Sequence, residues 1–465
     1  MKKTLNLGVI GIDHGHIFDM LDEMIKEGCS CNCFWTEGDP LTLQEFNKKY
    51  PNVKRKENKE EILNDSSIDM ILISSIPVDR AGHSIDALKA GKDVMVDKPG
   101  CTTLDQLNNL KNTVKETGKI WSVNFSERFH VAAVAKAEEL VNEGKIGKIK
   151  QTIGTGPHRQ GNYERPDWFY NRQSYGGIIT DIGSHQIHQF LVFTNSNQAK
   201  INHALVENTT KKDMPGFQDF GEVNLTGNGG HGYIRLDWFT PDALPTWGDG
   251  RLLILGDKGF IEIRKYTDLA KSEKGNHLFL ANNDEVKHID CSNVKLPYFS
   301  NLINDVLNRT ETACPQDLTY LSMELAIKAQ EQAEKKLKKY QVAIIGTNIG
   351  AKHFEDFQKV SEMFNVHTLC GLTREAIDKI LESNTETKVS LNFDDVIKIK
   401  EIDIIDICLP PHLHFSACKK AMEAGKHVIC EKPLVSSLKE VDELEKISNA
   451  TVSYTHLRAH ETLLD

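Results

Sequence analysis

The sequence predicts an α/β protein in which two doubly wound parallel sheets flank an α+β domain. Short apolar runs alternate with helical patterns near both ends of the chain, as in parallel sheets covered by helices. Residues 91–99 (GKDVMVDKP) return as residues 425–433 (GKHVICEKP), an offset of 334 positions (425 − 91). A stretch that recurs with so little change indicates that a whole domain is repeated.

The composition indicates a globular protein and argues against two classes of partner. The chain has 465 residues, 39% hydrophobic and 26% charged, enough for two to four domains. A net charge of −10 argues against nucleic acid and against an anionic membrane surface. No apolar run reaches the ~20 residues of a membrane span, and residues 5–12 read as a strand rather than a signal peptide. Ten cysteines, read as reduced thiols, favour a cytoplasmic protein.

The first unit opens with a strand over residues 5–12, a turn containing Gly11, Asp13, His14 and Gly15, and a helical pattern after it. Strand, glycine turn and helix form the opening of a dinucleotide-binding βαβ unit. The fingerprint calls for a second glycine where Asp13 stands. A carboxylate there would repel a phosphate, although it could instead cap the helix.

The next strand, residues 29–35, leads to Glu37, which lies 22 residues after Gly15 (37 − 15). An acidic residue near this distance takes the ribose hydroxyls of a bound nucleotide; the alternative is a surface glutamate. Cys29, Cys31 and Cys33 alternate, so strand geometry predicts one face for all three. They lack a second ligand cluster, so we expect no metal there.

The unit is completed by the continuous apolar strand 68–74, which Ser75 and Pro77 end, and by the repeated strand that leads to Lys98. A helix over 104–117 and a strand over 120–125 close it. Ligands of open α/β sheets bind at the carboxyl ends of the strands, where Lys98 stands.

From residue 126 the pattern changes to alternating strands. We expect a helix over 131–143, strands from residue 149, and a mostly antiparallel sheet, which together indicate an α+β domain. The further strands expected in this sheet are 221–225, 232–239, 251–255 and 260–264, and a helix is expected over 318–337.

Between these elements, Asp181 and His185 are four residues apart and share one face of a helix. A carboxylate beside an imidazole can orient it as a general acid or base; the alternatives are a surface ion pair or a buried, satisfied histidine. His188 completes an H-x-x-H pair, but no third metal ligand is evident.

The chain restarts at residue 341. Gly346 and Gly350 match Gly11 and Gly15 at an offset of 335 (346 − 11), and residues 402–407 match 68–73. The candidate nucleotide-binding residues of this second copy are Gly346, Asn348, Gly350, Pro410, His414, Glu431 and Lys432.

Four motifs together resemble the Gfo/Idh/MocA family of NAD(P)-dependent oxidoreductases. They are the glycine turns, the D-K-P and E-K-P strand ends at 97–99 and 431–433, the P-P-H-L-H stretch at 410–414, and D-I-G-S-H at 181–185. The resemblance covers residues 4 to about 335 as one full-length member and 340 to about 449 as the Rossmann half of another.

The resemblance implies a Rossmann domain followed by a domain whose open sheet often mediates homo-oligomers. It implies that Lys98, Asp181 and His185 meet at the nicotinamide, with His185 as base, Lys98 stabilising the alkoxide and Asp181 orienting the site. Arg128 is a candidate contact to cofactor or substrate. Two departures bear on cofactor binding: Asp13 replaces a glycine, and Arg80 stands where the second copy has His414. Arg80 could offset the charge of Asp13 or bind a phosphate.

Residues 453–462 resemble the translation of a sequencing adapter, so we exclude them from the fold and expect a truncated second copy. The expected domains are a Rossmann domain at 1–122, an α+β domain at 123–338, a second Rossmann domain at 340–451 and an artefact at 452–465.

The leading functional hypothesis is a dehydrogenase that acts on the CH–OH group of a sugar or polyol with NAD or NADP, Glu37 weakly favouring NAD. A non-catalytic nucleotide-binding or scaffold protein and a metal-dependent isomerase or lyase using His185 and His188 are the alternatives. Candidates to line the site are His158, Tyr163, Trp168 and residues 237–241.

Overall fold

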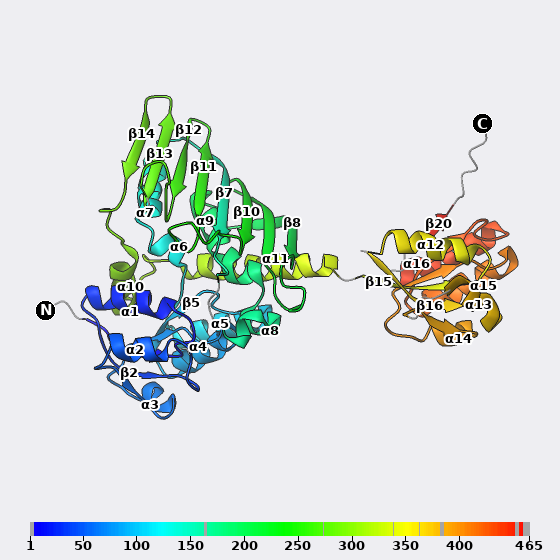
Figure 1. Ribbon diagram of the computed structural model, residues 1–465, viewed down its shortest axis with the longest axis horizontal. Helices are drawn as coiled ribbons and strands as arrows, with labels where there is room; N and C mark the ends of the chain where they lie inside the picture. Colours follow the sequence, from blue (N-terminus) through cyan, green and yellow to red (C-terminus); the bar gives the residue numbers. More distant parts are fainter. Residues whose placement is uncertain are drawn as a thin grey trace. The chain divides into compact units, whose positions relative to one another are not determined.

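The computed structural model describes residues 4–161, 165–272, 274–337, 339–361, 363–381, 386–451 and 455–458 (Figure 1). It contains two compact units, Met1–Glu334 and Lys335–Asp465. The boundary between them falls a few residues before residue 341, where the sequence pattern restarts. Among the described helices, none is both long and apolar enough to cross a membrane.

The first unit begins with a six-stranded parallel sheet in the order β3-β2-β1-β4-β5-β6. Every residue of β4, β5 and β6 is buried, because helices cover both faces of the sheet. Its strands are β1 Asn6–Ile10, β2 Ser30–Trp35, β3 Lys54–Arg55, β4 Met70–Ile73, β5 Asp93–Asp97 and β6 Trp121–Asn124. Its helices are α1 His16–Lys26, α2 Leu43–Lys49, α3 Glu60–Leu63, η1 Pro77–Asp79, α4 Arg80–Lys89 and α5 Leu104–Thr117.

The expectation that Cys29, Cys31 and Cys33 share one face of a strand is wrong, and Cys29 precedes β2. The register between β1 and β2 shifts at this point, since Leu7 pairs with Cys31 but Gly8 pairs with Cys33. The irregularity breaks the alternation, leaving Cys33 buried and Cys31 half-buried.

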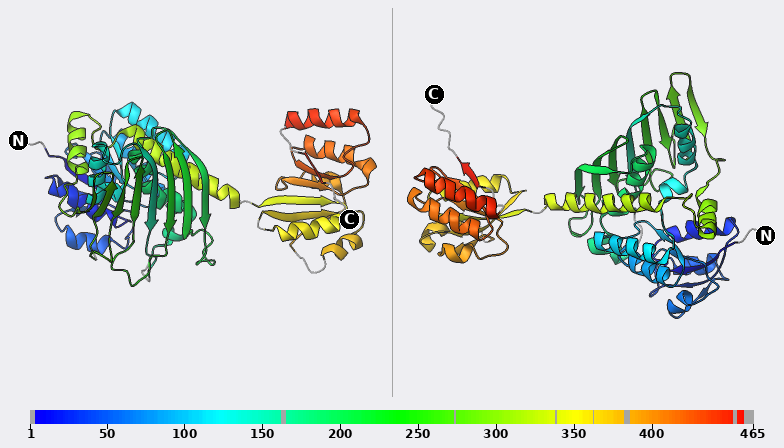
Figure 2. Two further views of the ribbon diagram at one scale, coloured as in Figure 1. Left: turned by 90° about the horizontal axis from the view of Figure 1, so that it is seen from above. Right: turned by 180° about the vertical axis from the view of Figure 1, so that it is seen from behind.

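The second sheet has eight strands in the order β14-β13-β12-β11-β7-β10-β9-β8, all paired antiparallel except β7 with β10. Helices gather on one face of this sheet (Figure 2). The sequence pattern did not predict β8, β13 and β14. The strands are β7 Ile149–Pro157, β8 Ala199–Glu207, β9 Phe220–Gly227, β10 His231–Asp237, β11 Arg251–Gly256, β12 Gly259–Arg264, β13 His277–Asn282 and β14 Val286–Asp290. The helices before and between them are α6 Ser126–Phe129, α7 Ala132–Asn142, η2 Asp167–Tyr170, α8 Arg172–Tyr175, η3 Ile179–Gly183 and α9 Ser184–Phe193.

Helices α10 (Tyr298–Asn308) and α11 (Gln316–Leu337) join the two sheets into one unit. In Figure 1, α11 lies between the eight-stranded sheet and the first Rossmann domain. Met323 and Ile327 of α11 belong to the core of the Rossmann domain, whereas Ala326 and Ala329 belong to the core under the second sheet. Both domains therefore hold fixed positions on one long helix.

The second unit repeats the first sheet, in the equivalent order β17-β16-β15-β18-β19-β20. Its strands are β15 Tyr340–Ile345, β16 Phe364–Cys370, β17 Lys388–Ser390, β18 Ile404–Ile407, β19 His427–Glu431 and β20 Thr455–Arg458. Its helices are α12 Ile349–Lys359, α13 Arg374–Leu381, α14 Phe393–Val396, α15 Pro411–Glu423 and α16 Leu438–Thr451.

Strand β20 corrects the expectation that residues 453–462 lie outside the fold. It pairs in parallel with β19, at the place that β6 occupies beside β5 in the first unit. Backbone hydrogen bonds form this pairing, so four residues join the sheet without the apolar pattern expected of a strand. The other residues of 452–465 lie outside the described part of the chain.

Candidate active site

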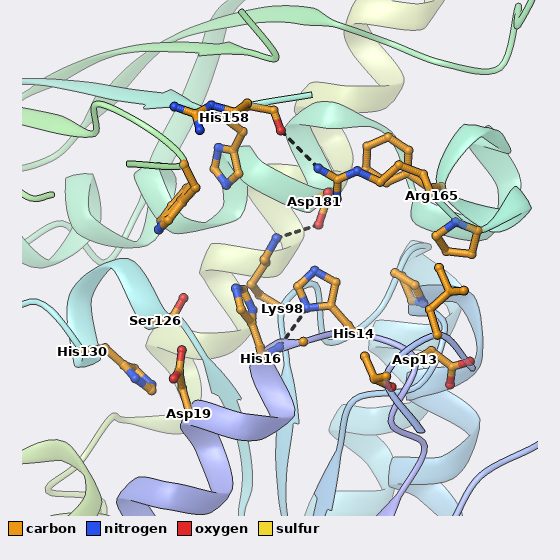
Figure 3. Close-up of a pocket in the computed structure, with 18 of the residues that line it drawn as sticks. Asp13, His14, His16, Asp19, Lys98, Ser126, His130, His158, Arg165 and Asp181 are labelled. Atoms are coloured by element: carbon orange, nitrogen blue, oxygen red, sulfur yellow. Dashed lines mark hydrogen bonds and ion pairs between the residues drawn. The ribbon is translucent and has the colours of Figure 1, made fainter. Parts of the chain in front are cut away.

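A cavity of about 760 Å³ lies where the first Rossmann domain meets the α+β domain (Figure 3). The glycine turn before α1 and the end of β5 form one side of it, and residues of the second domain form the other. Both the carboxyl edge of a parallel sheet and a domain interface are common places for ligands.

Lys98 and Asp181 meet in this cavity, as the resemblance implied (Figure 3). Lys98 directly follows β5, and its Nζ lies 2.8 Å from Oδ1 of Asp181 in the π-helical turn η3. Burial raises the pKa of Asp181, but the Lys98 ammonium outweighs it and holds that pKa below the ordinary value. Asp181 is therefore a carboxylate at neutral pH.

His185 is buried in the first turn of α9, with 1% of its surface exposed, and is not among the residues that line the cavity. Asp181 bonds to Lys98, and no hydrogen bond joins Asp181 to His185 in the described chain, so this carboxylate does not orient the imidazole directly. Nδ1 of His185 has no partner there. Burial, with Lys98 next, lowers the pKa of His185 well below 6.5, so the ring is neutral at pH 7.

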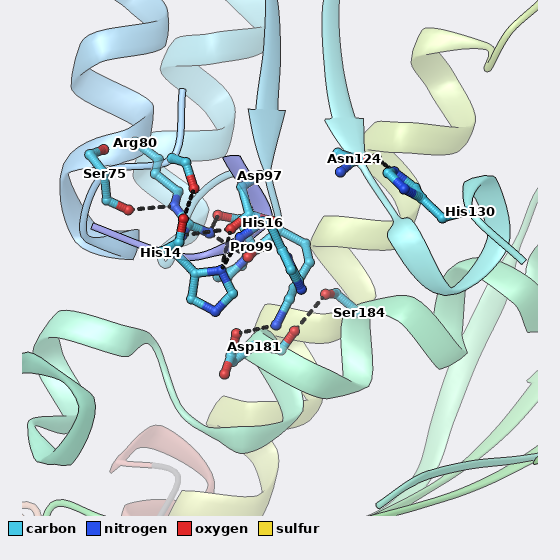
Figure 4. Close-up of polar contacts among 12 residues, drawn as sticks. His14, His16, Ser75, Arg80, Asp97, Pro99, Asn124, His130, Asp181 and Ser184 are labelled. Atoms are coloured by element: carbon cyan, nitrogen blue, oxygen red, sulfur yellow. Dashed lines mark hydrogen bonds and ion pairs between the residues drawn. The ribbon is translucent and has the colours of Figure 1, made fainter. Parts of the chain in front are cut away.

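Three basic side chains surround the buried carboxylate of Asp97 at the end of β5 (Figure 4). Nη2 of Arg80 lies 2.9 Å from it, Nδ1 of His16 2.8 Å and Nδ1 of His14 3.1 Å. Burial alone would raise the pKa of Asp97, but Arg80 and then the histidines hold it well below 3.8. For His14, burial lowers the pKa to about 4. Asp97 thus fixes both histidines at the mouth of the glycine turn.

Arg80 lines the cavity, and its guanidinium bonds to groups of the protein. Its fully buried side chain donates from Nε to the Ser75 carbonyl at 2.8 Å and from Nη1 to the carbonyls of Lys98 and Pro99. In the second copy His414 lies 2.7 Å from each of the equivalent carbonyls, those of Leu409 and Pro433. A guanidinium can make these bonds and still reach Asp97, which an imidazole is too short to do.

Arg128, a candidate contact to cofactor or substrate, is not among the residues that line the cavity. Its guanidinium binds Glu138 of α7 through two hydrogen bonds of 2.7 and 2.9 Å and His188 of α9 at 2.9 Å. His188 also bonds to Ser322, at 3.0 Å. These bonds connect four helices, α6, α7, α9 and α11, and occupy the histidine proposed as half of a metal pair.

The turn before α1 has the shape that a dinucleotide requires. Gly11 has φ +74°, and a Cβ there would lie 2.7 Å from the Ser75 backbone, so only glycine fits. Gly15 is the N-cap of α1, has no side-chain cap, and a Cβ there would meet nothing within 4 Å. This open space at a helix N-terminus fits a phosphate.

Asp13 lines the cavity beside this turn and does not cap α1, contrary to one of our expectations. Burial raises the pKa of Asp13 from 3.8 to about 6, although Arg80 opposes the shift. Its charge at neutral pH therefore opposes a phosphate at the turn.

The other expected cofactor contacts lie along the same edge. Glu37 is exposed just after β2, Ser75 is buried, and Pro77 lines the cavity. The hydroxyls of Ser75 and of Thr36, beside Glu37, are buried without a hydrogen-bond partner in the described chain. Two unsatisfied hydroxyls beside an open glycine turn are consistent with a bound nucleotide.

Much of the cavity wall was not predicted from the sequence, because the residues of the wall come from segments that lie far apart in the chain. His158, Trp168 and Trp238 line the cavity as expected, while Tyr163 lies outside the described residues. Missed residues are His16, Asp19, Ser126, His130 and Arg165 (Figure 3). The D-H-G-H sequence at 13–16 was the available signal for His16.

A buried ion pair that the sequence did not reveal supports this wall. Nζ of Lys265 lies 2.6 Å from Oε2 of Glu127, and Nε2 of Gln186 donates to the same oxygen at 2.7 Å. Glu127 and Lys265 are both fully or almost fully buried. Because Gln186 follows His185, the pair fixes the first turn of α9.

The second copy keeps the nucleotide turn, but among the described residues its lysine has no ion-pair partner corresponding to Asp181. Gly346 has φ +113°, and a Cβ there would lie 2.3 Å from the carbonyl of Cys408. Only glycine fits at this position, as at Gly11 in the first unit. Asn348 is the N-cap of α12 and Gly350 lies in its first turn. Lys432 is exposed, whereas Lys98 is 4% exposed beneath Asp181.

Comparison with family models finds the same organisation. The model described as "Oxidoreductase family, NAD-binding Rossmann fold" (GFO_IDH_MocA) matches residues 8–125 and again 340–455. The model of the GFO/IDH/MocA C-terminal domain matches residues 134–262.

Individual proteins are similar over parts of the chain. A crystal structure of a protein from Erwinia carotovora atroseptica SCRI1043, classed as an oxidoreductase, is 40% identical with a TM-score of 0.69, covering 71% of this chain and 99% of its own. The scyllo-inositol 2-dehydrogenase (NADP(+)) of Bacillus subtilis (strain 168) is 23% identical over 49% of this chain and 63% of its own length. The D-xylose dehydrogenase of Paenarthrobacter nicotinovorans is 26% identical over 31% of this chain and 38% of its own. The chain thus spans less than two thirds of the length of each of these two curated relatives.

Proposed function

The chain belongs to the Gfo/Idh/MocA family of oxidoreductases with an NAD-binding Rossmann fold, and we propose that its first unit is an NAD(P)-dependent dehydrogenase. The proposed reaction transfers a hydride between a CH–OH group of a sugar, polyol or related compound and a nicotinamide. The observation that carries the proposal is the Lys98–Asp181 ion pair, which lies in the cavity beside the nucleotide turn.

Lys98 is the residue placed to act on the substrate oxygen. Its ammonium faces the cavity at the carboxyl end of β5, where the charge of a developing alkoxide would be stabilised. Asp181 holds the ammonium in place at 2.8 Å, so its role is to position Lys98. A bound nicotinamide would supply the hydride acceptor or donor.

His185 remains the proposed base for the hydroxyl proton, a role that rests on the D-x-G-x-H resemblance. Its neutral ring can accept a proton, and Nδ1 is free of protein partners in the described chain. Its burial requires a small movement of α9 or of the side chain when substrate binds.

The proposed substrate class rests on two relatives and on the cavity wall, and the proposed nucleotide rests on Glu37. Two curated relatives carry names of polyol and sugar dehydrogenases, and Trp168 and Trp238 give the cavity apolar faces of the kind that sugars stack on. Glu37 lies just after β2, where its charge would disfavour a 2′-phosphate, which favours NAD.

A cytoplasmic homo-oligomer is also proposed. All ten cysteines are free, as in a reducing compartment. On the eight-stranded sheet, the cross-strand neighbours Leu255 and Phe260 are 42% and 39% exposed, and a partner would cover them. Light scattering of the full chain would give the mass.

The test is turnover of a sugar and polyol panel with NAD and NADP, followed through nicotinamide absorbance. Lys98→Ala should lower kcat/KM by about 10²–10³-fold, because one transition-state donor is lost. His185→Ala should also abolish turnover. Lys432→Ala, the equivalent change in the second copy, should leave kcat/KM within about twofold. Activity that survives both of the first two changes rules out this mechanism.

Tight NAD(P) binding without turnover on the panel would favour the non-catalytic alternative, which the charge of Asp13 motivates. The metal-dependent alternative is weakened because His188 is bonded to Arg128 and Ser322. Turnover that a chelator abolishes would restore it.

A further inference from the structure

The second unit contains a cluster of metal-ligating atoms that the proposed reaction does not use. Nδ1 of His353 in α12 lies 2.7 Å from Oδ2 of Asp406 in β18 and 3.2 Å from Sγ of Cys408, which follows β18. The third side of the triangle, Sγ of Cys408 to Oδ2 of Asp406, is 3.7 Å. Imidazole, carboxylate and thiolate are the ligand types of protein Zn²⁺ sites.

The size of the triangle suits a tetrahedral ion. With Zn–N and Zn–O of about 2.0 Å and Zn–S of about 2.3 Å, ligand atoms lie roughly 3.3–3.6 Å apart. The His353–Cys408 and Cys408–Asp406 distances lie within about half an ångström of this range. The shortest distance, from His353 to Asp406, joins two atoms that are hydrogen-bonded to each other. Small side-chain rotations would therefore admit the ion.

A second, independent observation points to a missing partner. The Asp406 side chain is fully buried, and its other oxygen, Oδ1, has no hydrogen bond in the described chain. Leaving a buried carboxylate oxygen unsatisfied is costly, and a divalent cation on this carboxylate would compensate its charge. His353 is 1% and Cys408 7% exposed, so the cluster is almost closed to solvent.

The far side of the imidazole has the arrangement that metal sites use to orient a histidine. Nε2 of His353 lies 2.9 Å from Oε1 of Glu431 at the end of β19. A carboxylate on the second ring nitrogen fixes the tautomer and leaves the first nitrogen for the metal.

We propose that the second Rossmann domain holds one Zn²⁺ ion, bound by Nδ1 of His353, the carboxylate of Asp406 and the thiolate of Cys408. Glu431 orients His353 from behind, and a water molecule takes the fourth position. Loading the ion releases the protons on Nδ1 and on the thiol to solvent, because only the deprotonated groups bind it. Although three protein ligands and a water are also the pattern of catalytic zinc, the cluster is almost closed to solvent, so we assign the ion to the stability of the fold.

The cluster in the first unit is a poorer site, although His14, His16 and Asp97 are also close together. Arg80 already neutralises Asp97 at 2.9 Å, and a fixed guanidinium repels a cation. It also contains no sulfur, which separates the two clusters spectroscopically.

The test is titration of the metal-free full chain with Co²⁺, a tetrahedral substitute for Zn²⁺. We expect one equivalent to give visible d–d bands and a near-ultraviolet sulfur-to-cobalt charge-transfer band, and one equivalent of Zn²⁺ to remove both. Cys408→Ser should remove the charge-transfer band, and Asp406→Asn should weaken Co²⁺ binding at least tenfold.

The matched control is Cys370→Ser, which changes another buried thiol of the same domain and should leave the bands intact. The competing account is a proton-bound His353 shared by Asp406 and Glu431, which predicts no charge-transfer band in the unsubstituted chain. Absence of that band, or its persistence in Cys408→Ser, overturns the proposal. The unsubstituted chain alone gives the first result, so a variant that fails to fold does not block the test.

Discussion

At the scale of single residues, Asp13 is where the chain departs most from an ordinary nucleotide turn. Its pKa of about 6 lies well above 3.8 because the side chain is buried. The carboxyl is charged above pH 6 and neutral below it, so repulsion of a pyrophosphate is present at high pH and lost as the pH falls through about 6. An Asp at this place makes nucleotide affinity depend on pH.

We therefore expect the Kd for NAD⁺ to rise by roughly fivefold between pH 5 and pH 8, the equivalent of about 1 kcal/mol for one like-charge contact. NAD⁺ is the suitable ligand because its pyrophosphate does not titrate in this range. Isothermal titration calorimetry at several pH values gives the measurement.

In Asp13→Asn the Kd should be independent of pH and equal to the low-pH value of the unsubstituted chain. A pH dependence that survives this change would mean that another group, such as His14 or His16, controls the affinity.

Two glycines of the same turn differ in what they are needed for. Gly11→Ala forces an L residue to φ +74° against the Ser75 backbone, so it should destabilise the first unit by about 1–3 kcal/mol or more. Gly15→Ala meets no protein atom and should change stability by less than about 0.5 kcal/mol, yet weaken NAD⁺ binding.

Urea unfolding followed by tryptophan fluorescence measures the first effect. All five tryptophans (Trp35, Trp121, Trp168, Trp238 and Trp247) lie in the first unit, so the signal reports on that unit alone. Equal stability losses in both variants would contradict the assignment of the open space at Gly15 to the nucleotide.

At the scale of elements, the first turn of α9 depends on the buried pair between Glu127 of α6 and Lys265 after β12. Removing one partner of a buried pair leaves a buried charge, at a cost of about 3–5 kcal/mol. We expect Glu127→Gln to lower the urea midpoint accordingly, by the same fluorescence assay.

The comparison variant is Glu139→Gln, which breaks the exposed pair with Lys136 in α7. An exposed pair contributes at most about 1 kcal/mol, so this change should be nearly neutral. Similar losses of stability in the two variants would show that burial does not raise the contribution of the Glu127–Lys265 pair above that of an exposed pair.

The repeated elements show how much the surroundings of one strand decide. Strands β5 and β19 end in D-K-P and E-K-P, and both lie between equivalent strands. Lys98 is buried beneath Asp181, whereas Lys432 is exposed. The motif therefore marks a nucleotide-binding fold, and the following domain decides whether its lysine meets a partner.

At the scale of the whole molecule, every residue of the proposed active site belongs to the unit Met1–Glu334. We expect a protein of residues 1–338 to keep the urea midpoint and the kcat/KM of the full chain within about twofold. Unfolding and turnover assays of both proteins test this. A large loss of activity with an unchanged midpoint would show that the second unit contributes to catalysis.

The sequence predicted the fold well where local pattern dominates. The 334-residue repeat, the strand ends and the position of Lys98 follow from apolar runs and turn residues, which neighbouring residues determine. The prediction was weaker for β8, β13 and β14, and it excluded β20, whose place in the sheet comes from backbone pairing rather than from apolar alternation.

What the sequence determined by itself was the presence of two Rossmann domains, each with a lysine at the carboxyl end of the same strand. Only the tertiary structure decided that His185 is buried, that Arg80 binds Asp97 and backbone carbonyls, and that Arg128 connects helices. The physical reason is competition: a charged side chain pairs with whichever partner folding brings nearest, and those partners come from distant segments that no local pattern specifies.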